Sequence, residues 1–233
     1  MKLAGIIGGI GPESTLDYYR SIISRYRERN RDGSYPSIIV NSINLRKILD
    51  FMEADRLADV TEYLLTEVRR LHRAGADFAA LSANSPHIVF DELQQQSPIP
   101  LVSIVKVACR AAKAQGLKSV GLMGARFTMQ GRFYPDTFAG EGIKVVAPSL
   151  EEQAYIHDKY MNELIAGRFL PETRQRLLII AERLRIQEGI EGLILAGTEL
   201  PLILRDVDKN EARIPFLDTT ALHVEEIVNQ ILS

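Results

Sequence analysis

The chain repeats a short pattern in two places, at nearly the same offset. The segment GADFAALSANSPH (75–87) aligns with GIEGLILAGTELP (189–201) at an offset of 114 residues. The segment AGIIGGIGPEST (4–15) resembles VGLMGARFTMQG (120–131) at an offset near 116. In each case a glycine-flanked apolar run leads into a turn. Two matches at similar offsets predict an internal duplication and therefore two similar lobes.

Short apolar runs alternate with longer amphipathic segments along the chain. The predicted strands are 3–7, 37–43, 78–81, 101–103, 119–123, 144–146 and 192–195. The predicted helices are 13–30, 54–74, 87–96, 104–115, 129–139, 156–166, 171–187 and 222–232. Most of these strands are apolar throughout, which is typical of a parallel sheet covered by helices on both faces.

This alternation predicts the α/β class. We expect two pseudo-symmetric three-layer α/β lobes with mainly parallel sheets. The first lobe is expected to comprise residues 1–98 and 212–233, and the second residues 99–211. Because open α/β sheets bind ligands at the carboxyl ends of their strands, a cleft between the two lobes is the expected site.

Composition narrows the classes of partner. The net charge is −2, and the 28 Lys and Arg residues are spread along the chain, which argues against a nucleic-acid or anionic-membrane surface. No apolar run reaches the length of about 18 residues that a membrane helix needs. The single cysteine, Cys109, excludes an internal disulfide and a cysteine-rich metal site. We expect a cytoplasmic protein without a metal or organic cofactor.

The glycine-rich segment GGIGPEST (8–15) precedes a predicted helix. Backbone N–H groups around Gly9 could bind a substrate carboxylate, assisted by the helix dipole. The alternative is a tight strand-to-helix turn. The segment is neither a phosphate loop nor a dinucleotide fingerprint, because it lacks Gly-Lys-Ser/Thr and has Ser14 where a third glycine is needed.

Polar side chains follow the two repeated strands. Asn84 and Ser85 can hydrogen-bond a carboxylate or an amine, or they can cap the next helix. His87 is a candidate acid or base, or a histidine with a structural hydrogen bond. Thr198 and Glu199 occupy the matching turn of the second half, where Glu199 binds a substrate ammonium or caps a helix.

Two arginines are expected near strand ends. Arg46 follows the second predicted strand, and Arg126 precedes Thr128 after the fifth. An arginine facing a cleft suits bidentate binding of a carboxylate. We therefore include Arg46, Arg126 and Thr128 among the candidate substrate-binding residues.

These motifs resemble those of the aspartate/glutamate racemase family, the cofactor-independent group that includes aspartate, glutamate and hydantoin racemases. The resemblance covers nearly the whole chain, and its anchors are GGIGPEST, NSPH, GARFTM and GTELPLIL. It implies two pseudo-symmetric α/β lobes, a site in the cleft, a small amino acid or dicarboxylate as ligand, and a homodimer.

The resemblance also implies two catalytic thiols, and this chain lacks both. The family's Cys-Asn-Thr motif reads Ala83-Asn84-Ser85 here, and its Gly-Cys-Thr-Glu motif reads Ala196-Gly197-Thr198-Glu199. Ala83 and Gly197 have no acid–base group. Asn84, Ser85, Thr198 and Glu199 fall on positions that resemble those holding the amino acid's carboxylate and ammonium, and Arg46 on one for a side-chain carboxylate.

Three functions remain open on these residues. The first is a racemase or related isomerase, independent of pyridoxal phosphate, with a non-cysteine acid–base set for which His87 and Glu199 are the candidates. The second is a lyase that needs a single protonation. The third is a ligand-binding or regulatory protein that kept the pocket and lost the thiols.

Overall fold

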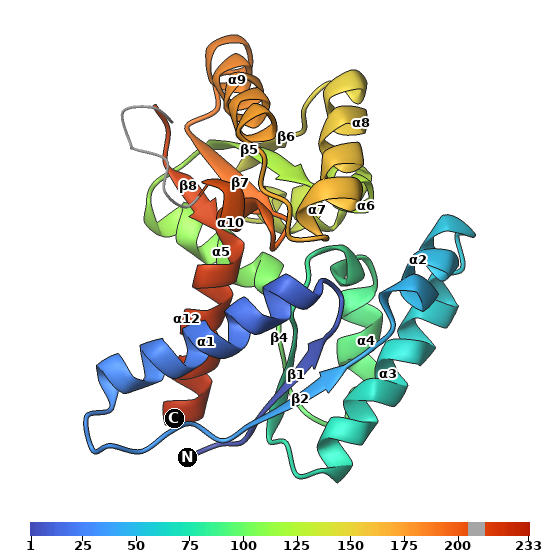
Figure 1. Cartoon of the computed structure of the whole chain (residues 1–233), viewed down its shortest axis with the longest axis vertical. Coiled ribbons are helices and arrows are strands. Elements are labelled where there is room, and N and C mark those ends of the chain that lie inside the picture. Colours follow the sequence, from blue (N-terminus) through green and yellow to red (C-terminus); the bar gives the residue numbers. More distant parts are fainter. Residues whose placement is uncertain (205–212) are drawn as a thin grey trace. The chain divides into compact units, whose positions relative to one another are not determined.

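The computed structural model describes residues 1–204 and 213–233. Contacts within the chain divide it into two units. The first comprises Met1–Ile104 with His223–Ser233, and the second comprises Val105–Leu222. Each unit contains one parallel sheet (Figure 1). The first predicted lobe boundary, after residue 98, lies before the boundary between Ile104 and Val105. The second predicted boundary, between residues 211 and 212, lies outside the described residues.

The sheet of the first unit has the strand order β2-β1-β3-β4, all parallel. Its strands are β1 (Ala4–Gly8), β2 (Ile38–Ser42), β3 (Phe78–Leu81) and β4 (Leu101–Val102). Every residue of β1 and β3 is buried, as the unbroken apolar runs predict. In the register, Ile7 of β1 pairs with Leu81 of β3, so the turns after these strands begin at the same edge of the sheet.

The helices of the first unit follow its strands in sequence. They are α1 (Pro12–Arg29), α2 (Leu45–Glu53), α3 (Leu57–Arg73), the short η1 (Ser85–Val89) and α4 (Phe90–Gln96), with most of the final helix α12 (Thr219–Leu232). Pro12 begins α1, a position where its missing N–H is no loss. The helix buries Ser14, Tyr18, Ile22 and Tyr26, a four-residue spacing that keeps them on one face.

The second unit repeats this arrangement with the strand order β6-β5-β7-β8. Its strands are β5 (Ser119–Gly124), β6 (Lys144–Val146), β7 (Gly192–Ala196) and β8 (Phe216–Asp218). Its helices are α5 (Ile104–Ala114), α6 (Arg126–Gln130), α7 (Phe133–Ala139), α8 (Leu150–Lys159), the π-helical turn η2 (Tyr160–Leu164), α9 (Pro171–Glu188) and α10 (Leu200–Leu204). No helix in the described ranges is long and apolar enough to cross a membrane.

The shared strand order confirms the two-lobe α/β fold that the sequence repeat predicts. In each sheet, the first strand in the sequence lies between the second and the third, and the fourth pairs with the third. The repeated segments supply equivalent strands, β1 with β5 and β3 with β7. The polar turns found by the repeat therefore follow equivalent strands in the two units.

Some local predictions were wrong. The helix expected over 54–74 begins at Leu57, and a separate helix, α2, precedes it. Asn44 caps α2 by accepting a hydrogen bond of 3.0 Å from the backbone N–H of Arg46. Arg46 therefore lies in the first turn of a helix rather than in a loop at the end of a strand.

Two further helices and one strand differ from the prediction. The helix expected over 129–139 is divided into α6 and α7 by Gly131, and the one expected from residue 156 begins at Leu150, where Ser149 and Glu152 form a capping box. Strand β8 was missed because three residues, FLD, are too few to show a periodic pattern.

His223 lies in the buried interior of the first unit. Its Nδ1 lies 2.9 Å from the hydroxyl oxygen of Tyr18, and its Nε2 lies 3.0 Å from the carbonyl oxygen of Val102. Because a carbonyl only accepts, Nε2 carries the proton and Nδ1 accepts from Tyr18. Burial lowers the pKa of His223 to about 4, so the ring is neutral in the folded protein.

This neutral histidine predicts a loss of stability in mild acid. In the unfolded chain His223 takes up a proton near the ordinary histidine pKa of 6.5, whereas the folded residue does so only near 4. Its stabilising contribution is therefore complete above that range and is lost as the pH falls through it. Between pH 7.5 and pH 5 the free energy of unfolding should fall by about 2 kcal/mol through this residue.

Urea unfolding at the two pH values measures this effect. His223→Gln removes the titrating ring and keeps an amide that can accept from Tyr18 and donate to Val102. His72→Gln is the matched control, because His72 is exposed on α3. The variant at position 223 should lose less stability than the wild type on acidification, and equal losses in the two proteins would contradict the assignment.

Candidate active site

The turn after β1 is built around Gly9. Its backbone φ is +78°, and a Cβ there would lie 2.5 Å from the carbonyl oxygen of Ile43. Its N–H donates a hydrogen bond of 2.9 Å to Oγ1 of Thr15 in α1. The glycine is thus required by the tight turn, and its N–H is engaged within that turn.

The turn after β3 carries the first set of predicted polar residues. Ser82 donates through Oγ to the carbonyl oxygen of Ile7 at 3.0 Å, which ties this turn to β1. Ala83 and Asn84 are buried, and Ser85 is partly exposed. Asn84 is the N-cap residue of η1, but its side chain makes no capping hydrogen bond. The structure therefore does not support the alternative that the Asn84 side chain caps the following helix.

His87 is fixed by two backbone hydrogen bonds. Its Nδ1 lies 3.0 Å from the carbonyl oxygen of Ala83, and its Nε2 accepts from the N–H of Ile104 at 3.2 Å. These partners require the tautomer with the proton on Nδ1. The ring is 2 % exposed and stacks on Phe90 at 4.9 Å between centroids. A general base needs a lone pair facing the substrate, and here that lone pair is bonded to backbone.

The two candidate arginines lie in different environments. Arg46 is paired with Asp50 at 2.7 Å and with Glu53 at 3.9 Å, both on its own helix α2. Arg126 is exposed at the start of α6, and its guanidinium carbon lies 5.1 Å from the centroid of the Phe127 ring. Within the described ranges no carboxylate is paired with Arg126. Of the two, Arg126 is the better placed to bind an incoming carboxylate.

The turn after β7 contains the one acidic residue among the predicted site residues, Glu199. Glu199 has no exposed surface, and Thr198 is 1 % exposed. Oε2 of Glu199 accepts hydrogen bonds from Oγ1 of Thr198, at 3.0 Å, and from the hydroxyl of Tyr160. A buried carboxylate needs such donors, because removing it from water without them is costly.

Tyr160 is the residue of this turn that the sequence did not reveal. It is the first residue of the π-helical turn η2, which directly follows α8. Such turns are rare and occur often at functional sites. In the sequence, Tyr160 is only one tyrosine at the end of IHDKY, 39 residues from Glu199, so nothing marks it as a neighbour of Glu199.

Burial and charge act together on the Tyr160 phenol. Desolvation raises its pKa well above the usual value of 10, and the nearby charge of Glu199 raises it further. The phenol is therefore neutral at physiological pH. A neutral phenol next to a carboxylate can donate or pass on a proton, but it does not persist as a phenolate.

Three buried threonines follow strands of the second sheet. Thr128 in α6 is fully buried, with its N–H bonded to the carbonyl of Ala125 at 2.9 Å. Thr219, at the start of α12, donates through Oγ1 to the carbonyl of Leu195 at 2.7 Å. The hydroxyl of its neighbour Thr220 is buried without a hydrogen-bond partner in the described part of the chain.

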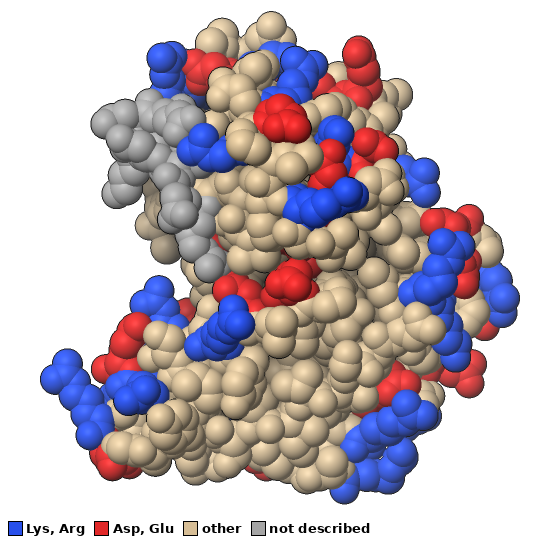
Figure 2. Space-filling view, in the orientation of Figure 1, with Lys and Arg blue, Asp and Glu red and all other residues tan. Residues whose placement is uncertain are grey.

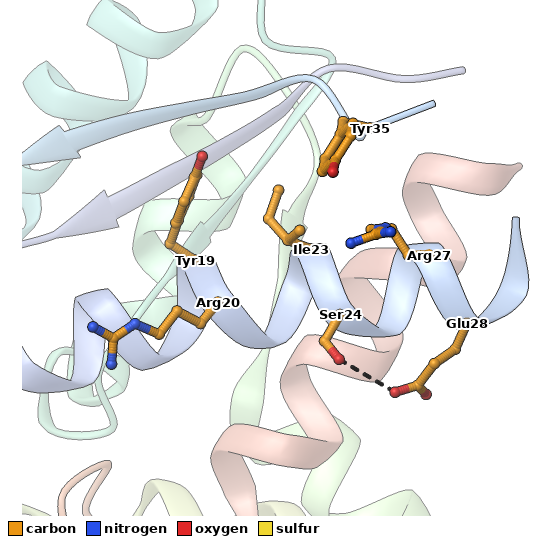
Figure 3. Close-up of a pocket in the computed structure, with 7 residues that line it drawn as sticks. All are labelled: Tyr19, Arg20, Ile23, Ser24, Arg27, Glu28 and Tyr35. Atoms are coloured by element: carbon orange, nitrogen blue, oxygen red, sulfur yellow. Dashed lines mark hydrogen bonds between the residues drawn. The ribbon is translucent and has the colours of Figure 1, made fainter. Parts of the chain in front are cut away.

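A surface pocket on the first unit lies outside the predicted turns. Its volume is about 550 Å³, and Figure 3 shows it along α1 and the segment before β2. It is lined by Tyr19, Arg20, Ile23, Ser24, Arg27, Glu28 and Tyr35. Arg27 lies over the Tyr35 ring at 5.3 Å, and Ser24 is bonded to Glu28. None of the predicted site residues lines it.

Acidic and basic side chains are interspersed over the visible surface (Figure 2), in keeping with the net charge of −2. Among residues 1–204 and 213–233, no three His, Cys, Asp or Glu side chains come together as a metal site. The predicted strand-end turns of each unit therefore remain the candidate functional regions.

Comparisons with known proteins agree with this fold. Residues 7–227 match the model of the Asp/Glu/Hydantoin racemase family. The broad specificity amino-acid racemase RacX of Bacillus subtilis is 26% identical over 239 aligned residues, covering 99% of both chains. Among solved structures, a putative Asp/Glu racemase from Yersinia pestis is 27% identical with a TM-score of 0.88, and an aspartate racemase homologue from Pyrococcus horikoshii is 33% identical with a TM-score of 0.83. Both structural matches cover all of each chain. The family model spans nearly the whole chain, and the chain therefore belongs to the Asp/Glu/Hydantoin racemase family.

Proposed function

We propose that the protein is an amino-acid racemase or related isomerase that works without pyridoxal phosphate and without thiols. It would move the Cα proton of a small amino acid or dicarboxylate in the cytoplasm. Membership of the racemase family supports the reaction class, and the relative named as a broad specificity racemase supports an amino-acid substrate. The two positions that the family resemblance assigns to thiols are Ala83 and Gly197, so the acid–base groups must come from other residues.

The observation that carries this proposal is the buried carboxylate of Glu199. It lies in the turn after β7, two residues from Gly197, and accepts hydrogen bonds from Tyr160 and Thr198. A Cα proton is so weakly acidic that its removal needs a positioned base, and a buried carboxylate at a strand end is suited to that task. We therefore assign Glu199 as the base.

The remaining predicted residues are assigned to substrate binding. Asn84, Ser85 and Thr198 offer the amide and hydroxyl groups that we assign to the amino acid's carboxylate and ammonium. For a side-chain carboxylate we favour Arg126 over Arg46, because Arg46 already has two acidic partners. Gly9 shapes its turn. His87 is not proposed as a base, since both of its ring nitrogens are bonded to backbone.

The position of Glu199 also favours a second candidate, a lyase that protonates only one face of its substrate. Two residues were predicted as acid or base. Both ring nitrogens of His87 are hydrogen-bonded to backbone groups, so Glu199 is the remaining candidate. A racemase must deliver a proton to the opposite face as well, which a lyase need not do. The two candidates are separated by the stereochemistry of proton exchange.

Proton exchange in D₂O tests the proposal. The protein is incubated with a panel of L- and D-amino acids, beginning with aspartate and glutamate, without added cofactor, and loss of the Cα proton is followed by NMR. Exchange accompanied by formation of the opposite enantiomer supports a racemase. Exchange with retention supports the one-face candidate. Binding without exchange, detected as thermal stabilisation, would overturn both and favour a ligand-binding protein.

A further inference from the structure

The space beside Gly197 is occupied by the side chain of Tyr160. A Cβ built on Gly197 would lie 2.5 Å from Cε2 of Tyr160, 3.1 Å from Cζ and 3.2 Å from the hydroxyl oxygen. A contact of 2.5 Å is far shorter than carbon atoms tolerate. As long as Tyr160 keeps this place, position 197 can therefore hold only a glycine.

The phenol places an acid–base oxygen close to position 197. Its oxygen lies 3.2 Å from the point where a side chain at position 197 would begin, and that position is the one that the family resemblance assigns to a thiol. The missing side chain at position 197 thus leaves the space that the Tyr160 side chain fills. Gly197 makes room for Tyr160, and Tyr160 brings a hydroxyl to the vacated position.

Tyr160 is held in place from two sides. Its ring belongs to the buried apolar cluster of the second unit, with Ile156 and Leu200 among the other members. Its hydroxyl donates to Oε2 of Glu199, which also accepts from Thr198. The side chain is 7 % exposed, so it is almost fully enclosed. A side chain fixed in this way needs little reorganisation during a reaction.

We propose that Tyr160 relays the Cα proton between the substrate and Glu199, in the place where the family resemblance puts the second thiol. This inference rests on the proposed function, because it assigns a residue to that reaction. If the site served only to bind a ligand, Tyr160 would have no Cα proton to relay.

The relay balances in protons and charge. The Cα–H bond breaks, its electron pair stays on the substrate as a carbanion conjugated with the carboxyl group, and the proton forms a bond to the Tyr160 oxygen. The original phenol proton passes at the same time to Oε2 of Glu199. Tyr160 is neutral before and after the step, and Glu199 stores the proton. The reverse sequence returns a proton to the same face of Cα, so the relay serves one of the two faces that a racemase uses. No oxidant or reductant is needed.

The raised pKa of Tyr160 is consistent with this assignment. Burial and the neighbouring charge of Glu199 both disfavour the phenolate. A tyrosine acting alone as a base would have to persist as that phenolate. A relay avoids it, because the phenol gains one proton as it gives up another.

The variant Tyr160→Phe tests the relay directly. It keeps the ring that fills the space beside Gly197 and removes only the hydroxyl. We expect the rate of Cα-proton exchange to fall by at least about 100-fold, with little change in amino-acid binding. Tyr134→Phe is the matched control, since Tyr134 is a fully buried tyrosine of α7 in the same unit, and it should stay within about twofold of the wild type. A folded Tyr160→Phe protein that exchanges at the wild-type rate would overturn the relay.

A second measurement separates failure of this inference from failure of the proposed function. A wild type that exchanges no Cα proton would refute the proposed function, and the relay with it. The placement of Tyr160 is then judged by the melting temperatures of Gly197→Ala, Tyr160→Ala and the double variant. We expect the double variant to lose less than the sum of the single losses, because removal of the ring makes room for the new methyl group. Additive losses would overturn the placement of Tyr160 beside Gly197, whatever the activity.

Discussion

Replacement of Glu199 by glutamine should lower the rate of Cα-proton exchange by about 10²- to 10⁴-fold. Glutamine has nearly the same shape, and its amide oxygen can still accept from Tyr160 and Thr198. It cannot take up the proton, so the base is lost while the turn after β7 is kept. The initial rate of deuterium incorporation, with the best substrate of the panel, gives the ratio.

The matched control for this change is Glu67→Gln. Glu67 is also a buried glutamate, 2 % exposed on α3, where it accepts from Asn41 and pairs with Arg70. It is not among the proposed acid–base groups. We expect it to lose stability and to keep its exchange rate. If Glu199→Gln remains folded and exchanges as fast as this control, Glu199 is not the base.

Replacement of Gly9 by alanine should strongly destabilise the protein through the turn after β1. An alanine there would hold a positive φ, and its Cβ would press on the backbone of Ile43, at 2.5 Å from the oxygen and 2.7 Å from the nitrogen. Positive φ costs a non-glycine residue about 1–2 kcal/mol, and forcing a methyl group into a packed site adds about 1–3 kcal/mol. The sum is a loss of about 2–5 kcal/mol in the free energy of unfolding.

Gly33→Ala separates the two costs. Gly33 has a similar φ of +85°, but a Cβ there meets nothing within 4 Å. It should show the conformational cost of about 1–2 kcal/mol alone. Urea unfolding of both variants gives the difference, which measures the crowding at Gly9. Equal losses at the two positions would mean that the turn after β1 has room that the structure does not show.

The fold was largely predictable because its strongest signal is repeated. Apolar runs flanked by glycine mark β1, β3, β5 and β7, and each is buried on both faces, so tertiary packing agrees with the local pattern. The failures lie where local and global signals differ. Strand β8 is three residues long, and its pairing with β7 comes from distant parts of the chain rather than from any pattern of its own.

The candidate site was predictable only in part, for a physical reason. Thr198 and Glu199 adjoin a strand that the sequence marks, so their place at its end followed directly. Tyr160 reaches the same turn from a helix 39 residues earlier, and only the packing of side chains brings its hydroxyl to Glu199. For His87 the sequence was misleading. Its residue type suggested a base, but its two ring nitrogens are hydrogen-bonded to backbone groups of Ala83 and Ile104, and no sequence motif reveals these bonds.

The central claim is that this chain moves a Cα proton without a thiol, and its single cysteine makes the claim testable. Cys109 is buried on α5, 3 % exposed, where burial raises the pKa of its thiol and Sγ lies 3.7 Å from the carbonyl oxygen of Thr137. Cys109→Ala yields a protein with no sulfhydryl group at all.

The measurement is the rate of Cα-proton exchange by this thiol-free protein in D₂O, beside the wild type. The proposed mechanism predicts exchange above a no-protein blank, at a rate within about twofold of the wild type, because Cys109 has no part in the reaction. Exchange by the wild type that disappears in a folded Cys109→Ala protein would contradict the account, and would mean that the one remaining thiol is the base.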